Sequence, residues 1–439
     1  METPAVKGNG VVIFGGGTAT NSLVDIFNDL RGSRACTLSY VIPISDNGGS
    51  SSELIRVFGG PGIGDIRSRL VRLIPAGPEG NADLAATKAL FNYRLSSDPH
   101  AARSGVARCR GRPPRDLDGH LEREEGAHSA RPHLPGIHGV RHLPPEPDLR
   151  HPPQTLVLPA INTSFTHHIS AGLADKAVIT GQNAISHPSA PTSLPDIAAA
   201  ATQDVANQQA EDTDEHDLIE DANLPGSLPM LRKQYIEFSK SGEEDLSSRI
   251  ERVWYINPYG HEIRPRANPK VLDAVAGAGA VIYSIGSLYT SLVPSLILRG
   301  VGAAIAAAPR GVVKVLILNS SLDRETGPST DPFSAVDFVR AIVRALQESQ
   351  AADVRQVAGS TSADEVRKYV THLIHLDGDG TPKVDRDELA RLGVEPIRVY
   401  GRRVDGMLRY DEGGLMRAIE AVIGTGREIM GRSRRNTKQ

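Results

Sequence analysis

Four short segments of the chain combine glycines with hydroxyl or acidic side chains, and these residue types can bind a phosphate group. The segments are 15–20, 45–52, 59–70 and 285–294. Glycine lets a ligand approach the backbone closely, so that backbone N–H groups can donate to phosphate oxygens. In the first segment three glycines are followed by two threonines, whereas a simple turn needs only one glycine. The sequence therefore predicts a site for a phosphate-bearing ligand, with a tight turn that binds nothing as the alternative.

The residues expected to contact the phosphate groups come from all four segments and from one later strand end. They are Gly15, Gly16, Gly17 and Thr18 in the first segment, Asn47, Gly48, Gly49 and Ser50 in the second, Arg67 in the third, Gly286, Ser287, Tyr289 and Thr290 in the fourth, and Asn319.

Two carboxylates, Asp46 and Asp65, stand among these glycines. Mg²⁺ in proteins is commonly held by one or two carboxylates together with the phosphates of a substrate. We therefore expect Asp46 and Asp65 to hold Mg²⁺ or to orient an acceptor hydroxyl, which would make them the catalytic and metal-binding residues. The structural alternatives are a turn at Asp46 and a helix cap at Asp65.

Apolar runs and helical spacings around these segments indicate the elements that position them. Residues 11–14 are typical of a short buried strand, and apolar residues recur at helical spacing over 21–30. Further strands are expected over 37–44, 280–284 and 314–320. Alternation of strands and helices, with polar loops after successive strands, favours an α/β fold with a doubly wound, Rossmann-like, mostly parallel sheet. The loops would then meet at the carboxyl edge of that sheet.

Composition excludes several classes of function. The chain of 439 residues carries a formal net charge of −3 and has a pI near 6.5, which disfavours binding along a nucleic-acid backbone. The two cysteines, Cys36 and Cys109, have no metal-ligand spacing and point to a reducing compartment. The most apolar stretch, 293–308, is interrupted by Arg299, so no membrane span is expected. We expect a cytoplasmic protein.

Two regions interrupt the expected domain. Segment 103–153 is crowded with Arg, His and Pro and shows no apolar period. A disordered insertion, a mistranslated or misannotated segment, and a metal or anion tract are its alternative interpretations. Segment 190–248 contains an acidic run and is expected to be a second disordered insertion. The domain itself would comprise 8–100, 154–189 and 249–425, with a basic tail at 426–439 that is expected to be disordered over 431–439.

Three ordered motifs resemble one known family. The motifs GGGTAT at 15–20, SDNGGSS at 45–51 and GDIR at 64–67 are similar to those of the CofD/YvcK family. The later segments GSLYTS at 286–291 and Glu325-Thr326-Gly327 continue the resemblance. The family comprises 2-phospho-L-lactate transferases and related gluconeogenesis or morphogenesis factors. The resemblance also implies a Gly-Asn motif on a loop that lines the substrate site, and 103–153 contains none.

The resemblance implies two alternative functions for one pocket. In the first, the protein transfers a phospholactyl-type group from a guanosine-diphosphate-linked donor to a deazaflavin hydroxyl. In the second, the pocket senses a nucleotide sugar without turnover, as in the YvcK branch. Both imply Mg²⁺ as cofactor, a nucleotide or nucleotide-sugar type of small molecule as partner and neither nucleic acid nor membrane; a homodimer is the assembly considered.

Overall fold

The structure is a computed structural model that describes residues 10–34, 36–44, 61–74, 82–92, 155–163, 167–186, 245–309, 311–353, 357 and 362–436. The chain divides into two compact units. One comprises Met1–Ser68 with Pro153–Gln439, and the other comprises Arg69–Pro152. In the second unit the structure describes the later part of helix α4 (Gly64–Leu73) and helix α5 (Ala82–Asn92). All further elements belong to the first unit.

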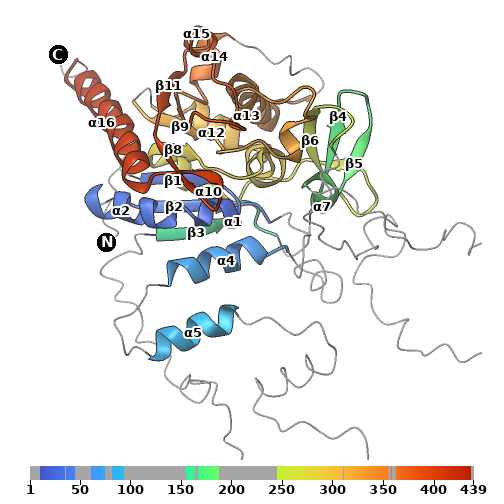
Figure 1. Ribbon diagram of the computed structural model, residues 1–439, viewed down its shortest axis with the longest axis horizontal. Coiled ribbons are helices and arrows are strands. Elements are labelled where there is room, and N and C mark those ends of the chain that lie inside the picture. The colour runs from blue at the N-terminus through green and yellow to red at the C-terminus, as the bar shows by residue number, and fades with distance from the viewer. Residues whose placement is uncertain are drawn as a thin grey trace, which may run out of the picture. The chain divides into compact units, whose positions relative to one another are not determined.

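A seven-stranded parallel sheet forms the centre of the first unit (Figure 1). Its strand order is β11-β10-β9-β8-β1-β2-β3. From β1 the chain adds strands in one direction, and from β8 it adds them in the other, so the order reverses between β1 and β8. This confirms the predicted doubly wound α/β sheet. The strands are β1 (Gly10–Phe14), β2 (Leu38–Ile42), β3 (Thr155–Pro159), β8 (Ala278–Tyr283), β9 (Val313–Ile317), β10 (His372–His375) and β11 (Glu395–Arg398).

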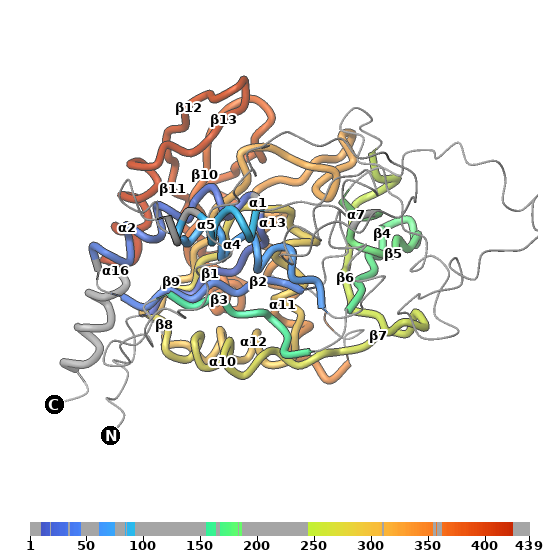
Figure 2. Tube along the Cα trace, turned by 90° about the horizontal axis from the view of Figure 1, so that it is seen from below, coloured from blue at the N-terminus to red at the C-terminus, as the bar shows by residue number. Residues whose placement is uncertain are grey.

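Both faces of this sheet are covered, which explains why β1 consists almost entirely of apolar residues. Val12 and Phe14 belong to a core cluster that includes residues of α10 (Pro269–Ala276), α12 (Val301–Ala306) and α13 (Ala335–Gln350). Val11 and Ile13, which alternate with them, are equally buried outside that cluster. Figure 2 shows α10 and α12 along one side of the strands.

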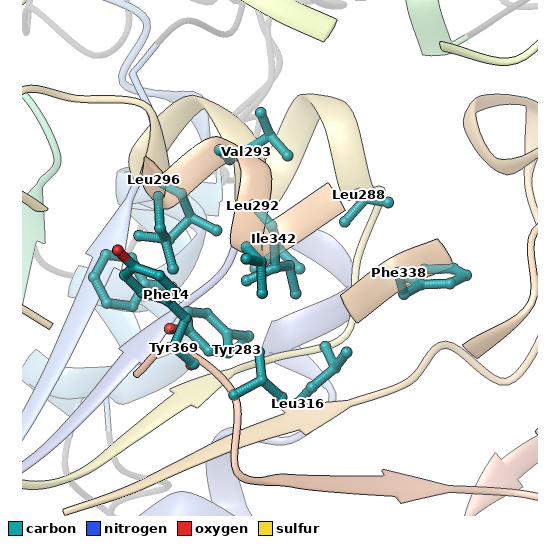
Figure 3. Close-up of a cluster of buried hydrophobic side chains, with 14 of the residues drawn as sticks. Phe14, Tyr283, Leu288, Leu292, Val293, Leu296, Leu316, Phe338, Ile342 and Tyr369 are labelled. Atoms are coloured by element: carbon teal, nitrogen blue, oxygen red, sulfur yellow. Dashed lines mark hydrogen bonds between the residues drawn. The ribbon is translucent and has the colours of Figure 1, made fainter. Parts of the chain in front are cut away.

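The core reaches directly under the carboxyl ends of β1 and β8. Phe14 and Tyr283 are paired residues at the ends of these strands, with ring centroids 6.0 Å apart. The Tyr283 hydroxyl donates to the backbone oxygen of Tyr369, at 2.9 Å. Figure 3 shows these three rings together beside Leu292 and Leu296. The two central strands therefore end at the same level, and the loops that follow them leave the sheet side by side.

Smaller elements complete the first unit. A four-stranded antiparallel sheet has the order β5-β4-β6-β7, and β12 pairs with β13 as a hairpin. The strands are β4 (His168–Leu173), β5 (Val178–Thr180), β6 (Ile250–Ile256), β7 (Glu262–Ile263), β12 (Gly401–Val404) and β13 (Met407–Tyr410). The helices are α1 (Thr18–Asn21), α2 (Val24–Arg34), α7 (Gln182–Ser186), the π-helical turn η1 (Leu288–Leu292), α11 (Val293–Leu296), the 3₁₀ turn η2 (Arg324–Thr326), α14 (Ala363–Arg367), α15 (Arg386–Arg391) and α16 (Glu412–Asn436).

The helices differ from the sequence prediction in two places. In place of one helix over 21–30 the structure has two, α1 and α2. Because α1 begins at Thr18, helical structure starts immediately after the glycines. The expectation of a disordered tail is wrong as far as Asn436, because α16 continues to that residue. Arg occurs four times between 427 and 435, and it favours helix continuation. Segment 103–153 and residues 190–244 lie outside the described residues, whereas 245–248 lead into β6, with Leu246 buried.

No helix in the described part of the chain is long and apolar enough to cross a membrane.

Helix packing around the sheet generates a prediction about Gly302. A Cβ atom at this position of α12 would collide with the backbone oxygen of Leu346 in α13. We expect Gly302→Ala to lower the free energy of unfolding by about 2 kcal/mol or more, because backbone cannot move aside without separating the helices. Urea unfolding measures this.

Gly32→Ala is the matched control. Gly32 lies in α2, and a Cβ atom there meets nothing within 4 Å. This change should raise the free energy of unfolding by about 0.5–1 kcal/mol, since alanine favours helix. Equal stabilities of the two variants would contradict the close packing of α12 on α13.

Candidate functional site

Side chains from later in the chain stand close against the glycines of the loop after β1. A Cβ atom on Gly16 would lie 2.6 Å from Ser291 Oγ, and one on Gly17 would collide with the carboxylate of Asp65. The Gly15 N–H donates to the backbone oxygen of Val41 in β2, at 3.2 Å. The triple glycine thus serves close approach by neighbouring chain segments, in addition to any ligand.

The loop after β8 lies against the loop after β1. Thr20, which is buried in α1, donates from Oγ1 to the backbone oxygen of Ile285 at 2.9 Å. Gly286 has a positive φ of 143°, and a Cβ atom there would be 3.9 Å from the Ala19 Cβ. The two loops therefore lie side by side at the point where the strand order reverses, with Gly15, Gly16 and Gly17 buried and Gly286 partly exposed. In doubly wound sheets, ligands bind at this position.

Asn319, at the carboxyl end of β9, positions the second loop. Its Oδ1 accepts from the Gly286 N–H and its Nδ2 donates to the Gly286 oxygen, both at 2.9 Å. This pair of bonds fixes the peptide of a glycine whose own conformation is unusual. Asn319 thus contributes to the site by holding the backbone of the β8 loop.

Asp65 reaches the first loop from the first turn of α4. Its Oδ2 would be 3.2 Å from a Cβ atom on Gly16, and its carboxylate contacts the position of a Cβ on Gly17. Arg67 follows two positions later on the same helix, so the two side chains leave it in different directions. The structure therefore brings Asp65 against the glycines.

Glu325 is a buried carboxylate that holds the start of η1. Its side chain is 1% exposed, and it accepts hydrogen bonds from two backbone amides and two hydroxyls. Oε2 accepts from the N–H groups of Tyr289 and Thr290, at 2.8 and 3.0 Å. Oε1 accepts from the hydroxyls of Thr290 and Ser186, at 2.6 and 2.7 Å. An anionic group of the protein thus already occupies the amides that open η1.

Burial changes the acidity of this carboxylate. Loss of water, together with the nearby carboxylate of Asp323, raises the pKa of Glu325 from 4.5 to about 7. The pKa of Asp323 is raised as well, chiefly by its own loss of water, although Thr326 and Ser287 donate to it. Two acids of raised pKa therefore lie behind the β8 loop, and one of them contacts Ser287.

The raised pKa predicts a pH-dependent stability that Glu325→Gln removes. The folded state holds this proton more tightly than the unfolded chain, so the contribution stabilises the fold below about pH 4.5 and is lost as pH rises through about 7. Glutamine can accept from both amides and donate to both hydroxyls. The free energy of unfolding of Glu325→Gln, relative to that of the unsubstituted protein, should therefore rise by about 3 kcal/mol between pH 4.5 and 8.

Urea unfolding across this pH range measures the difference. Glu412→Gln is the control, because the side chain of Glu412 is 67% exposed. Its stability relative to the unsubstituted protein should stay constant with pH. A constant difference for Glu325→Gln would show that Glu325 is ionised in the fold at its ordinary pKa.

The structure brings together part of the set of residues predicted from the sequence. Gly15, Gly16, Gly17, Asp65, Gly286, Ser287 and Asn319 surround the carboxyl ends of β1 and β8, and Thr18 is the first residue of α1. Tyr289 and Thr290 lie behind the loop. The Tyr289 ring is 4% exposed, and its hydroxyl donates to the Ile250 oxygen at 2.9 Å. Asp46, Asn47, Gly48, Gly49 and Ser50 lie outside the described residues.

Sequence reasoning missed the residues that support the loops from below. Glu325 belongs to a motif noticed only by resemblance, and Asp323 and Ser186 were not considered. Ser284, at the end of β8, is fully buried, and its hydroxyl has no hydrogen-bond partner among the described residues. A glutamate beside a loop gives no signal in the sequence that it will reach a helix start 35 positions earlier.

The side chains near the glycine loop can be compared with the ligands that Mg²⁺ requires. No group of three or more acidic, histidine or cysteine side chains arranged to hold a metal occurs among the described residues. Asp65 alone lies at the glycine loop there. A single carboxylate fits an ion that takes its other ligands from water and from a substrate's phosphates, which is the usual coordination of Mg²⁺. It does not fit a resident structural metal.

These features define a class of protein: a doubly wound α/β fold with a glycine-lined surface at its switch point and a carboxylate beside it. Comparison with known families agrees with this class. Residues 11–400 match the family described as 2-phospho-L-lactate transferase CofD. The chain belongs to the CofD family, as its motifs predicted.

Individual relatives extend over most of the chain. The uncharacterized protein YNL011C of Saccharomyces cerevisiae is 34% identical over 414 residues, which are 83% of this chain and 90% of that protein. The gluconeogenesis factor of Bacillus subtilis is 24% identical over 394 residues, covering 88% and 89% of the two chains. A crystal structure of a UPF0052 family member from Bacillus halodurans, 18% identical, covers 94% of this chain and 99% of its own with a TM-score of 0.52. That likeness shows the same fold.

Proposed function

We propose that the glycine-lined surface at the switch point binds the phosphate groups of a nucleotide or nucleotide-sugar type of ligand together with Mg²⁺. The observation that carries the proposal is the contact between Asp65 and the Gly16-Gly17 backbone. A carboxylate beside a loop without side chains can hold Mg²⁺ while phosphate oxygens approach the backbone. The motifs at 15–20, 45–51 and 286–291 resemble those of the CofD/YvcK family, which supports the same ligand class.

Electrostatics favour one placement of the phosphates over another. Glu325 already accepts from the amides of Tyr289 and Thr290, so these amides are not free to bind a phosphate. Asp65 lies against Gly16 and Gly17, and Mg²⁺ would neutralise its charge. We therefore place the phosphates over the first loop, and the sugar or acyl portion of the ligand beside Gly286 and Ser287.

Within this proposal the protein is a transferase of phosphorus-containing groups of the CofD type. It would move a phospholactyl-type group from a guanosine-diphosphate-linked donor to a deazaflavin hydroxyl. Such transfer depends on charge neutralisation and alignment more than on a covalent enzyme intermediate. Asp65 and Mg²⁺ supply the neutralisation. Asp46, outside the described residues, is proposed as the second carboxylate that orients the acceptor.

The second candidate is a nucleotide-sugar-binding regulator without turnover. Two observations favour it. The Bacillus subtilis relative is named a gluconeogenesis factor. In addition, two carboxylates near the β8 loop are already bonded to protein hydroxyls: Glu325 is buried and accepts from Thr290, and Asp323 accepts from Thr326 and Ser287.

Binding tests both candidates at once. Titration calorimetry of the protein with GDP, GTP and UDP-sugars, with and without Mg²⁺, should show Mg²⁺-dependent binding of at least one ligand. Gly17→Ala should abolish it, because the new Cβ displaces the Asp65 carboxylate. Gly406→Ala serves as a control at a remote hairpin turn with space for the side chain, although its φ of 77° makes some loss of stability expected. If no ligand in the panel binds, both candidates are wrong.

A charge-only substitution tests the role of Asp65. Asp65→Asn should weaken binding in Mg²⁺ by about tenfold or more and leave the weaker Mg²⁺-free binding nearly unchanged. Asp379→Asn, at a fully exposed position, is the control and should match the unsubstituted protein. Equal losses with and without Mg²⁺ would assign Asp65 a structural role.

Turnover separates the two candidates. The protein should convert a deazaflavin acceptor in the presence of the guanosine-linked donor and Mg²⁺ if it is a transferase. Binding of a nucleotide sugar with no product from this pair would select the regulator.

A further inference from the structure

A second pocket lies behind η1, between α13 and the start of β6, and its volume is about 310 Å³. This size is at the lower end of the range for small-molecule sites. Its floor is apolar and consists of Tyr289, Phe333, Val343 and Val366, all nearly fully buried. The rings of Tyr289 and Phe333 meet edge to face, with centroids 6.1 Å apart. The floor therefore suits a short hydrocarbon body.

Two arginines of α13 line the pocket. Arg340 and Arg344 are four positions apart, so they lie one above the other on the helix. Arg340 is paired with Glu388 at 3.0 Å, and Arg344 donates from Nε to Glu348 at 3.1 Å. Glu348 also accepts from Arg252, whose charge is shared with Glu262. The ion pair described for Arg344 runs through Nε, so its two terminal nitrogens can donate to a further acceptor.

The other charged groups around the pocket limit the kind of anion it can take. Arg249 is occupied by Asp331 and Asp337 and lies over the Phe333 ring at 4.9 Å. Asp337 and Glu251 also line the pocket. Two carboxylates beside the site repel a dianion such as phosphate more strongly than a monoanion. A single carboxylate group, which an arginine fork can bind through two bonds, fits this balance of charge.

Gln347 adds a requirement for a hydrogen-bond donor. It follows Arg344 by three positions and lines the same pocket, and its buried Oε1 has no partner among the described residues. A buried acceptor left without a donor costs free energy, which a hydroxyl or amino group of a ligand can offset. This donor would lie beside the carboxylate that Arg344 binds.

We propose that this pocket binds a small organic carboxylate that carries a hydroxyl or amino group and a short hydrocarbon body. Arg344 would bind the carboxylate, Gln347 the hydroxyl or amino group, and Tyr289 and Phe333 the hydrocarbon. The site is separate from the nucleotide site proposed above, since Glu325 and the η1 backbone lie between the Tyr289 ring and the β8 loop.

Titration calorimetry with four related probes tests the proposal. The probes are L-leucine, its hydroxy analogue leucic acid, isocaproic acid, which lacks the hydroxyl, and the neutral amide of leucic acid. We expect at least one of the first two to bind with a dissociation constant of about a millimolar or less. Isocaproic acid should bind several-fold more weakly, and the amide about tenfold more weakly or worse.

Variants locate the binding in this pocket. Arg344→Gln should weaken the binding of the best probe about tenfold or more, because it removes a charged donor. Arg402→Gln is the matched control, at an arginine whose side chain is 61% exposed in β12, and should bind like the unsubstituted protein. Ala341→Phe places a large side chain from α13 into the pocket and should also remove binding. It tests the proposal independently if Arg344→Gln fails to fold.

Three results would overturn the proposal: neither leucine nor leucic acid binds at millimolar concentration, the amide binds as well as the acid, or Arg344→Gln and Ala341→Phe bind as the unsubstituted protein does. Tighter binding of inorganic phosphate than of either acid would reject the monocarboxylate class. Gly17→Ala should leave the probe affinity unchanged, so failure of the nucleotide site and failure of this site are distinguishable.

Discussion

The meeting of two backbone loops at van der Waals distance is the constraint on which the rest of the site depends. Gly16 and Gly17 have no space for a Cβ atom because Ser291 and Asp65 stand against them. Gly286 in turn lies against α1 and is held on both its N–H and its oxygen by Asn319. Strands β1 and β8 end in paired residues, Phe14 and Tyr283, so the sheet itself brings these loops to one place. The backbone positions at the switch point are therefore held by side chains from other segments of the chain, namely Asn319, Ser291 and Asp65.

Glu325 shows how the interior supports this arrangement. Four donors from η1 and α7 converge on one carboxylate with almost no exposure to water. These bonds make its burial possible, yet they do not return its pKa to the ordinary range, because loss of water outweighs them. The same carboxylate bonds the backbone of η1, which follows the β8 loop at the switch point. The ring of Tyr289, in the same turn, lines the second pocket beside α13.

The sheet was predictable from the sequence, whereas the supports of the site were not. Buried parallel strands are continuous apolar runs, and Val11–Phe14 is one of them. Glycine triplets after such a run predicted the loop of Gly15–Gly17. The β12–β13 hairpin carries a recognisable Asp405-Gly406 turn, with φ of 52° and 77°, that the sequence prediction did not use. Asn319 was predicted to contact a ligand, but the structure shows it bonded to Gly286, since spacing along the chain does not reveal which backbone a side chain will reach.

The bond from Thr20 to Ile285 joins residues 265 positions apart. During synthesis β1 and β2 therefore leave the ribosome long before β8 exists, and one edge of the central strand stays without its neighbour throughout that interval. An open edge of this kind can pair with the wrong chain, and such long-range pairing is slow to form. The switch point can be completed only once β8 has been made, and the newly made chain depends for that time on whatever keeps β1 from other strands.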